Sequence, residues 1–170
     1  IRIGQLGIDH HHPDYFALKV GNYILGGGGL VSRLSEQLRE KRGLTYNVTS
    51  QFLPMPGQGP FVIGLATRGQ QALLAENVTR EALANFVNNG PTAKELLAAK
   101  QYLTGSFPLS LASNRSIAQM LLKLSFYNLP VDYLDNYVAR IEKVSLDDIK
   151  HAFERTLYPD KLLQVSVGKQ

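Results

Sequence analysis

Cysteine is absent from this sequence, which excludes disulfide bonds and metal sites built from thiolates. No stretch approaches the roughly 18 consecutive apolar residues of a membrane-spanning helix, and the opening "IRIG" lacks the basic and then apolar pattern of a signal peptide. No long tract of proline, glycine or serine indicates a linker. We therefore expect one ordered domain, residues 1–170, without a membrane span. Because the chain opens on a strand-like segment without methionine, we expect this domain to belong to a longer protein.

The charge of the chain is only mildly basic. Its 18 lysines and arginines exceed its 14 acidic residues, for a net charge of +4. This surplus permits attraction to anionic partners, but for 170 residues it is weak evidence for nucleic-acid binding. Hydrophobic residues make up 44% of the chain, enough to build a sizeable core without a metal or a disulfide.

The first part of the sequence predicts a strand followed by two helices. Residues 1–8 alternate apolar and polar positions, and the apolar residues of 13–25 return every three or four positions, as they do on a helix. The glycines at 26–29 end this helix. A second helix is predicted over 30–42, where leucine recurs at every fourth position and Gly43 supplies a left-handed cap.

The rest of the sequence predicts a hairpin, a series of helices and a last strand. The alternation in 45–52 and the apolar run 61–67, separated by a stretch rich in turn residues, are typical of two hairpin strands. Residues 161–168 predict the closing strand. Helices are predicted at about 70–88, from 92 to before 108, and at 114–127, 131–141 and 146–156.

Two of these helices carry recognisable starts, and the order of elements predicts the fold class. Thr92 with Glu95 forms a capping-box pattern, and Ser145 precedes two aspartates in the manner of an N-cap. A hairpin is antiparallel, and the helices are bunched rather than alternating with strands. We therefore predict an α+β fold: a two-layer α/β sandwich whose mixed, mainly antiparallel sheet carries helices on one face, in the order βααββ, helices, β.

Two conspicuous motifs do not indicate a site. The run Gly26–Gly29 follows a predicted helix rather than a strand and lacks the Lys-Ser/Thr of a phosphate loop, so we interpret it as a flexible connector between helices. His10–His12 are adjacent in a loop, whereas metal ligands usually come from helical spacing or separate elements, and His151 stands alone. We interpret all four histidines as surface residues. No Gly-x-Ser-x-Gly elbow suggests a serine nucleophile.

The stretch "LREKRGLTY", residues 38–46, carries the remaining candidates. Arg39 is predicted on the flank of the helix, partly exposed, and Tyr46 at the start of the next strand, half-buried on the side of Val48. A guanidinium and a phenol at this spacing can both donate hydrogen bonds to the carbonyl oxygens of an extended peptide or to an oxyanion. The alternative is a cationic helix end in which Arg39 pairs with Glu36, followed by a core tyrosine. Spacing alone favours this alternative.

The segment "LGGGGLVSRLSEQLREKRGLTYNV" resembles the C-terminal homologous domain of the pitrilysin/insulinase-type zinc metallopeptidases, the family that includes mitochondrial processing peptidase. The likeness extends through "FVIGLAT", "TAKELLAAKQYLTGSF" and "VSLDDIKHAFERTLYPDKL" and covers essentially the whole chain. The fixed order of Leu-Gly-Gly-Gly, Ser-Arg-Leu and Leu-Arg-Glu-Lys-Arg-Gly-Leu-x-Tyr makes the resemblance specific.

The resemblance implies a role in peptide hydrolysis. In that family, two similar α+β domains are joined in tandem, and two such halves close around an unfolded peptide. This chain would be a substrate-binding, zinc-free domain, with Tyr46 donating to the scissile carbonyl oxygen as negative charge develops and Arg39 anchoring a neighbouring carbonyl of the extended peptide. Bacterial relatives that act outside the cytoplasm make the periplasm the expected compartment.

One departure from the family limits this reading. The chain has no His-x-x-Glu-His motif, so we expect it to bind no metal and to be inactive alone. The zinc of the full assembly would come from a catalytic domain or subunit of the same family, in a homo- or heterodimer. The alternative is a non-catalytic structural or assembly subunit, like the relatives built into respiratory complexes.

A nucleic-acid module is the least favoured reading. It would use the basic side chains of Arg33, Arg39, Lys41 and Arg42. Acidic residues interrupt this cluster, and no known nucleic-acid-binding motif accompanies it. We therefore expect no nucleic-acid partner.

Overall fold

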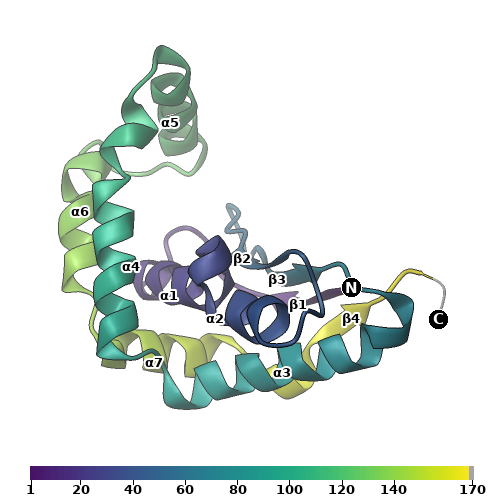
Figure 1. Ribbon diagram of the computed structural model, residues 1–170. Coiled ribbons are helices and arrows are strands. Elements are labelled where there is room, and N and C mark those ends of the chain that lie inside the picture. Colours follow the sequence, from purple (N-terminus) through teal and green to yellow (C-terminus); the bar gives the residue numbers. More distant parts are fainter. Residues whose placement is uncertain (169–170) are drawn as a thin grey trace.

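The computed structural model describes residues 1–168 (Figure 1), which contain one four-stranded sheet. The strands lie in the order β2-β3-β1-β4, and each of the three pairings is antiparallel. The last strand pairs with the first, so both ends of the described chain lie at the same side of the molecule (Figure 1). The strands are β1 (Arg2–Leu6), β2 (Val48–Phe52), β3 (Pro60–Leu65) and β4 (Leu163–Val165).

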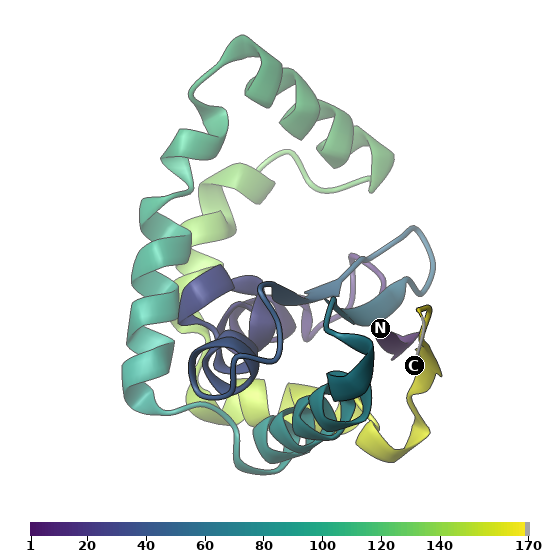
Figure 2. The ribbon, with the colours of Figure 1, turned by 45° about the vertical axis from the view of Figure 1, so that its right-hand side comes forward.

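Helices supply most of the remaining structure and cover one face of the sheet (Figure 2). The α-helices are α1 (Tyr15–Asn22), α2 (Arg33–Ser35), α3 (Ala72–Asn89), α4 (Ala93–Gly105), α5 (Asn114–Phe126), α6 (Tyr133–Lys143) and α7 (Leu146–Thr156). Short π or 3-10 segments are η1 (Tyr23–Gly27), η2 (Gly29–Val31), η3 (Glu36–Glu40), η4 (Gly69–Gln71), η5 (Pro108–Leu111) and η6 (Pro159–Lys161). The α+β fold class is confirmed.

The strand β3 shows why the sheet is covered on one side only. Successive side chains of a strand point to opposite faces, and Phe61, Ile63 and Leu65 are at most 3% exposed. The alternate residues Pro60, Val62 and Gly64 remain partly accessible. The apolar face of β3 thus packs against the helical layer, where each large side chain contributes about 1.5–3 kcal/mol by leaving water.

The local signals for helix starts are confirmed. Thr92 Oγ1 accepts a hydrogen bond from the amide of Glu95, and the Glu95 carboxylate accepts one from the amide of Thr92. Ser145 and Asp148 exchange the same pair of bonds at the start of α7. These bonds satisfy amides that have no partner inside the helix, and they fix where α4 and α7 begin.

The predicted helix over 30–42 begins later than expected. Ser32 has an extended backbone and accepts the amide of Ser35, so α2 starts at Arg33. Leu30 and Val31, which the periodicity placed on the apolar stripe, are 61% and 77% exposed. The serine caps the helix because its hydroxyl competes with the backbone for local hydrogen bonds.

The glycine run is less of a flexible connector than predicted. Gly26 and Gly27 complete the π-turn η1, and Gly26 is buried against β2. A Cβ at Gly26 would lie 2.5 Å from Ser50 Oγ and 2.6 Å from Ser50 N. The absence of a side chain at this position therefore allows η1 to approach the sheet closely.

The helix α5 stands apart from the layer that covers the sheet (Figures 1 and 2). It follows α4 through η5 and has no buried residue. None of the helices in residues 1–168 is both long and apolar enough to cross a membrane.

Candidate functional site

The segment that carries Arg39 is a short helix with a tightly packed inner face. Leu34 and Leu38 are fully buried, and α2 continues into the π-turn η3, where the amide of Lys41 donates to the carbonyl of Glu36. Gly43 then adopts a left-handed backbone with φ of 59°, as predicted for the cap. The two leucines therefore hold η3 against the core while its outer face carries charged side chains.

The segment that carries Tyr46 is held in place by two threonines. Thr45 Oγ1 donates to the carbonyl of Ala66 at 2.6 Å, and Thr67 Oγ1 donates to the carbonyl of Leu44, also at 2.6 Å. The amide of Asn47 in turn donates to Thr45 Oγ1. These side-chain bonds replace strand pairing in this segment, so β2 begins only at Val48.

The prediction that Tyr46 is half-buried in the strand is therefore wrong. Its side chain is 84% exposed, whereas Val48 is 2% exposed. The predicted alternation is correct from Val48 onward, but it does not extend back to Tyr46, because Thr45 bends the chain before the strand begins. An exposed tyrosine has its phenol free to meet a ligand.

Arg39 and Tyr46 lie against each other. Arg39 Cζ is 4.9 Å from the centroid of the Tyr46 ring, a distance typical of a cation–π contact. Arg39 is 31% exposed, as predicted for the flank of the helix, and its Nε lies 3.5 Å from Glu40 Oε1. Glu36, the ion-pair partner considered for Arg39, pairs instead with Lys41 at 2.8 Å. The structure thus joins the two residues that the sequence singled out.

The other cations of this segment are engaged by neighbouring groups. Arg33 makes two hydrogen bonds to the Glu95 carboxylate, at 2.6 and 2.7 Å. Arg42 Nη1 donates to the carbonyl and to the side-chain oxygen of Gln37, both at 2.9 Å. The basic cluster is therefore not an open cationic surface, and the structure adds nothing in favour of nucleic-acid binding.

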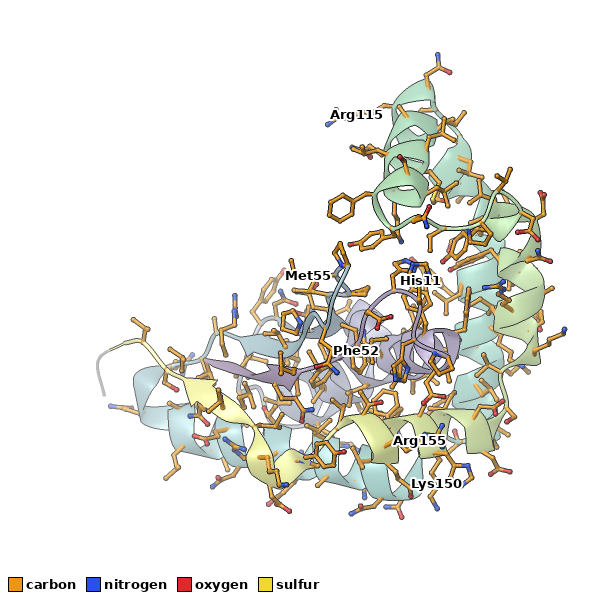
Figure 3. All side chains as sticks on the ribbon, turned by 180° about the vertical axis from the view of Figure 1, so that it is seen from behind. His11, Phe52, Met55, Arg115, Lys150 and Arg155 are labelled. Atoms are coloured by element: carbon orange, nitrogen blue, oxygen red, sulfur yellow. The ribbon has the colours of Figure 1, made fainter. Side chains whose placement is uncertain are left out.

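The histidine run is only partly at the surface, so the interpretation of His10 is wrong. His10 is 4% exposed, and its ring is stacked 4.3 Å from that of Tyr15 and tilted against that of Tyr127 at 4.6 Å. Burial, followed by the charge of Lys123, lowers the pKa of His10 to about 4. His11, on the loop before α1 (Figure 3), is exposed, and its Nε2 lies 2.7 Å from the carbonyl oxygen of Tyr127. The burial of His10 depends on Tyr127, which is remote in sequence, so no local pattern could have indicated it.

Residues 1–168 do not provide a metal site. No group of three or more histidine, aspartate or glutamate side chains in this range is placed to share one ion. Both ring nitrogens of the buried His10 lack a hydrogen-bond partner, but its neighbours are aromatic rings rather than further ligands. A zinc ion does not fit the side chains of this domain.

Comparison with known proteins identifies the fold and its family. The family model described as "Peptidase M16 inactive domain" matches residues 1–103. The chain belongs to this family. A crystal structure of the peptidase M16 inactive domain from Pseudomonas fluorescens is 43% identical, covers 95% of this chain and 38% of its own, and superposes with a TM-score of 0.89.

Two curated relatives bear names that point to zinc proteases and to a non-peptidase. "Uncharacterized zinc protease YmxG" from Bacillus subtilis is 34% identical over 67% of this chain, and "Non-peptidase homolog YmxG" from Helicobacter pylori is 31% identical over 77%. The chain spans 28% and 30% of these two relatives. This M16 inactive domain thus corresponds to about a third of the proteins it resembles.

Proposed function

We propose that this M16 inactive domain is the substrate-binding, zinc-free part of a zinc metallopeptidase that hydrolyses extended peptides. The observation that carries the proposal is the contact between Arg39 and Tyr46, with the guanidinium 4.9 Å from the ring centroid. Both side chains are reachable from solvent, yet the segments that bear them are fixed by buried leucines and by the bonds of Thr45. Membership of the family supports a peptidase as the whole protein.

Each residue of the pair has a defined task in this proposal. Stacking on Tyr46 restrains the Arg39 guanidinium, and its remaining N–H groups donate to a carbonyl of the bound peptide. The Tyr46 hydroxyl donates to the carbonyl oxygen that gains negative charge during hydrolysis, which lowers the barrier because the donor is already in place. Zinc would be held by a catalytic domain or subunit of the same family, which faces this pair in a homo- or heterodimer.

The test is Tyr46→Phe in the full-length, zinc-loaded protein. Turnover of an extended fluorogenic peptide should fall by about 100- to 1000-fold, since one donor to the oxyanion is lost. Zinc content should be unchanged, because no ligand is altered, and so should the melting temperature, because Tyr46 is 84% exposed. Unchanged turnover would remove Tyr46 from the mechanism.

A non-catalytic structural or assembly role is the second candidate, and one observation favours it. The Helicobacter pylori relative, 31% identical to this chain, carries the name "Non-peptidase homolog YmxG". Full-length protein that assembles and binds zinc, but cleaves no peptide of a random library, would support this role. Such an outcome would reject the peptidase proposal.

A further inference from the structure

A cavity of about 250 Å³ lies away from Arg39 and Tyr46, where α1, α4, α5 and α6 meet. Figure 1 shows α4 and α6 side by side near α1, with α5 leading away from them. Lys19 of α1 and Lys123 of α5 both line this cavity. Two ammonium groups from separate elements therefore line one partly open cavity.

Neither lysine has an acidic partner. Among residues 1–168, no carboxylate lies within ion-pair distance of Lys19 or Lys123, and none of the residues that line the cavity is acidic. Lys19 Nζ instead lies 4.6 Å from the centroid of the Tyr137 ring. Burial, followed by the charge of Lys123, lowers the pKa of Lys19 to about 8, and burial also lowers the pKa of Lys123. Both lysines are half-buried, and a partly desolvated ammonium without a counter-charge is costly, so an anion placed here would be stabilised.

A further polar side chain that lines this cavity lacks a hydrogen-bond partner. Tyr133 lines the cavity and is 4% exposed, and its Oη lies near the Tyr15 hydroxyl but has no partner with hydrogen-bond geometry in the described chain. The ring of His10, also buried and without a hydrogen-bond partner, lies 6.0 Å from that of Tyr133. His10 and Arg140 line a neighbouring cavity that shares Tyr133 with this one. Buried donors without acceptors are rare in folded proteins, and they commonly mark the place of a ligand or a water.

We propose that this cavity binds a small oxyanion, whose oxygens accept hydrogen bonds from the ammonium groups of Lys19 and Lys123 and from the Tyr133 hydroxyl. A volume of about 250 Å³ is below the range of drug-sized sites, and it suits an ion such as phosphate or a short dicarboxylate. Phosphate and a dicarboxylate both present anionic oxygens that can accept hydrogen bonds from the two lysines. The site is independent of the pair that contacts peptide in the proposed function, so either proposal can fail without the other.

The test is calorimetric titration of the full-length protein, in low chloride, with inorganic phosphate in one arm and succinate in the other. At least one probe should bind saturably. The probe with the lower Kd shows whether the site prefers a phosphate or a carboxylate. Lys19→Met and Lys123→Met should each weaken binding about tenfold or more, since a charge-assisted hydrogen bond is lost. Lys94→Met, which removes the same charge from the exposed start of α4, should bind like the wild type.

Stability measurements separate binding from folding. Lys19→Met places an apolar side chain of similar length in the aromatic setting and removes a half-buried ammonium, so its melting temperature should equal or exceed that of the wild type. If that variant does not fold, Lys123→Met and Tyr133→Phe carry the test, each expected to weaken binding. The proposal is overturned if neither probe binds up to about 10 mM, or if the pocket variants and Lys94→Met bind equally.

Discussion

Arg33 and Glu95 join α2 to the first turn of α4 through two parallel hydrogen bonds, Nε to Oε1 at 2.6 Å and Nη2 to Oε2 at 2.7 Å. Glu95 also accepts the amide and the hydroxyl of Thr92. Partial burial opposes ionisation of Glu95, but the bonds from Arg33 and Thr92 more than offset it and lower its pKa to about 2. One carboxylate thus ties the start of the Arg39 segment to a helix that is distant in sequence.

Glu95→Gln should destabilise the domain at neutral pH. Because the folded pKa of about 2 lies below the ordinary pKa of 4.5, the ionised carboxylate contributes stability above pH 4.5, and this contribution is lost as the pH falls through 2. We expect a loss of about 1–2 kcal/mol in the free energy of unfolding at pH 7, since partial exposure screens the pair. Urea unfolding at pH 7 and at pH 3 measures this loss. The difference in the free energy of unfolding between the variant and the wild type should be smaller at pH 3.

Glu142→Gln provides the matched control. Glu142 is exposed on α6, so its replacement should change stability by less than about 0.5 kcal/mol at either pH. If the deficit of Glu95→Gln stayed the same at both pH values, the ion pair with Arg33 would not be its source.

Gly26→Ala should be strongly destabilising. The new Cβ would lie 2.5 Å from Ser50 Oγ and 2.6 Å from Ser50 N. Ser50 N is a backbone atom of β2, which pairs with β3 and cannot move aside cheaply. We expect a loss of about 1–3 kcal/mol, measured by thermal unfolding. Gly105→Ala is the control, because nothing lies within 4 Å of its Cβ at the end of α4, and it should be neutral or stabilising by about 0.5 kcal/mol. Equal effects of the two substitutions would contradict the packing argument.

The sequence predicted best those features that depend on a few adjacent residues. The capping box at Thr92 and the N-cap at Ser145 were predicted correctly because each needs only a hydroxyl and nearby acids, and the structure shows that Ser145 also forms a full capping box with Asp148. The late start of α2 was missed because the apolar period of 30–42 continues across Ser32. The Ser32 hydroxyl caps the helix there, so the helix begins only at Arg33. Periodicity reports which side chains could share a face, but it does not report where the backbone bends.

In the candidate site too, local features could be predicted from the sequence, whereas features that depend on remote residues could not. The contact of Arg39 with Tyr46 follows from the resemblance and from the cap at Gly43, which turns the chain back. The exposure of Tyr46 was missed because Thr45 bonds to Ala66, which lies on the far side of the hairpin. The pocket of Lys19 and Lys123 has no sequence signal, since its lysines meet only through tertiary packing.

His10→Phe should remove an acid-sensitive step in unfolding. The folded pKa of about 4 lies below the ordinary histidine pKa of 6.5, so the unfolded chain binds the proton first, and the wild type loses stability as the pH falls from 6.5 toward 4. We expect this loss to be about 1–2 kcal/mol in the wild type and to be absent in the variant. A phenyl ring fits among Tyr15 and Tyr127 and leaves no unpartnered nitrogen.

Guanidinium unfolding at pH 7, 5.5 and 4.5 measures the effect of His10→Phe. The control is His151→Gln, because His151 is exposed on α7 and should leave the acid sensitivity as in the wild type. A variant that kept the full acid sensitivity would show that other groups, and not His10, titrate in this range.

Arg39→Lys tests whether the stacked guanidinium, rather than its charge alone, serves the proposed peptide site. Lysine keeps the charge but cannot lie flat on the Tyr46 ring or present a fork of N–H donors. In the full-length, zinc-loaded protein we expect kcat/KM for an extended peptide to fall about tenfold, with zinc content and melting temperature unchanged. Arg42→Lys is the control, because Arg42 bonds back to Gln37 on the same segment, and its kcat/KM should stay within about twofold of the wild type. Equal losses in the two variants would assign the effect to the general field of the basic segment and would remove Arg39 from direct contact with the peptide.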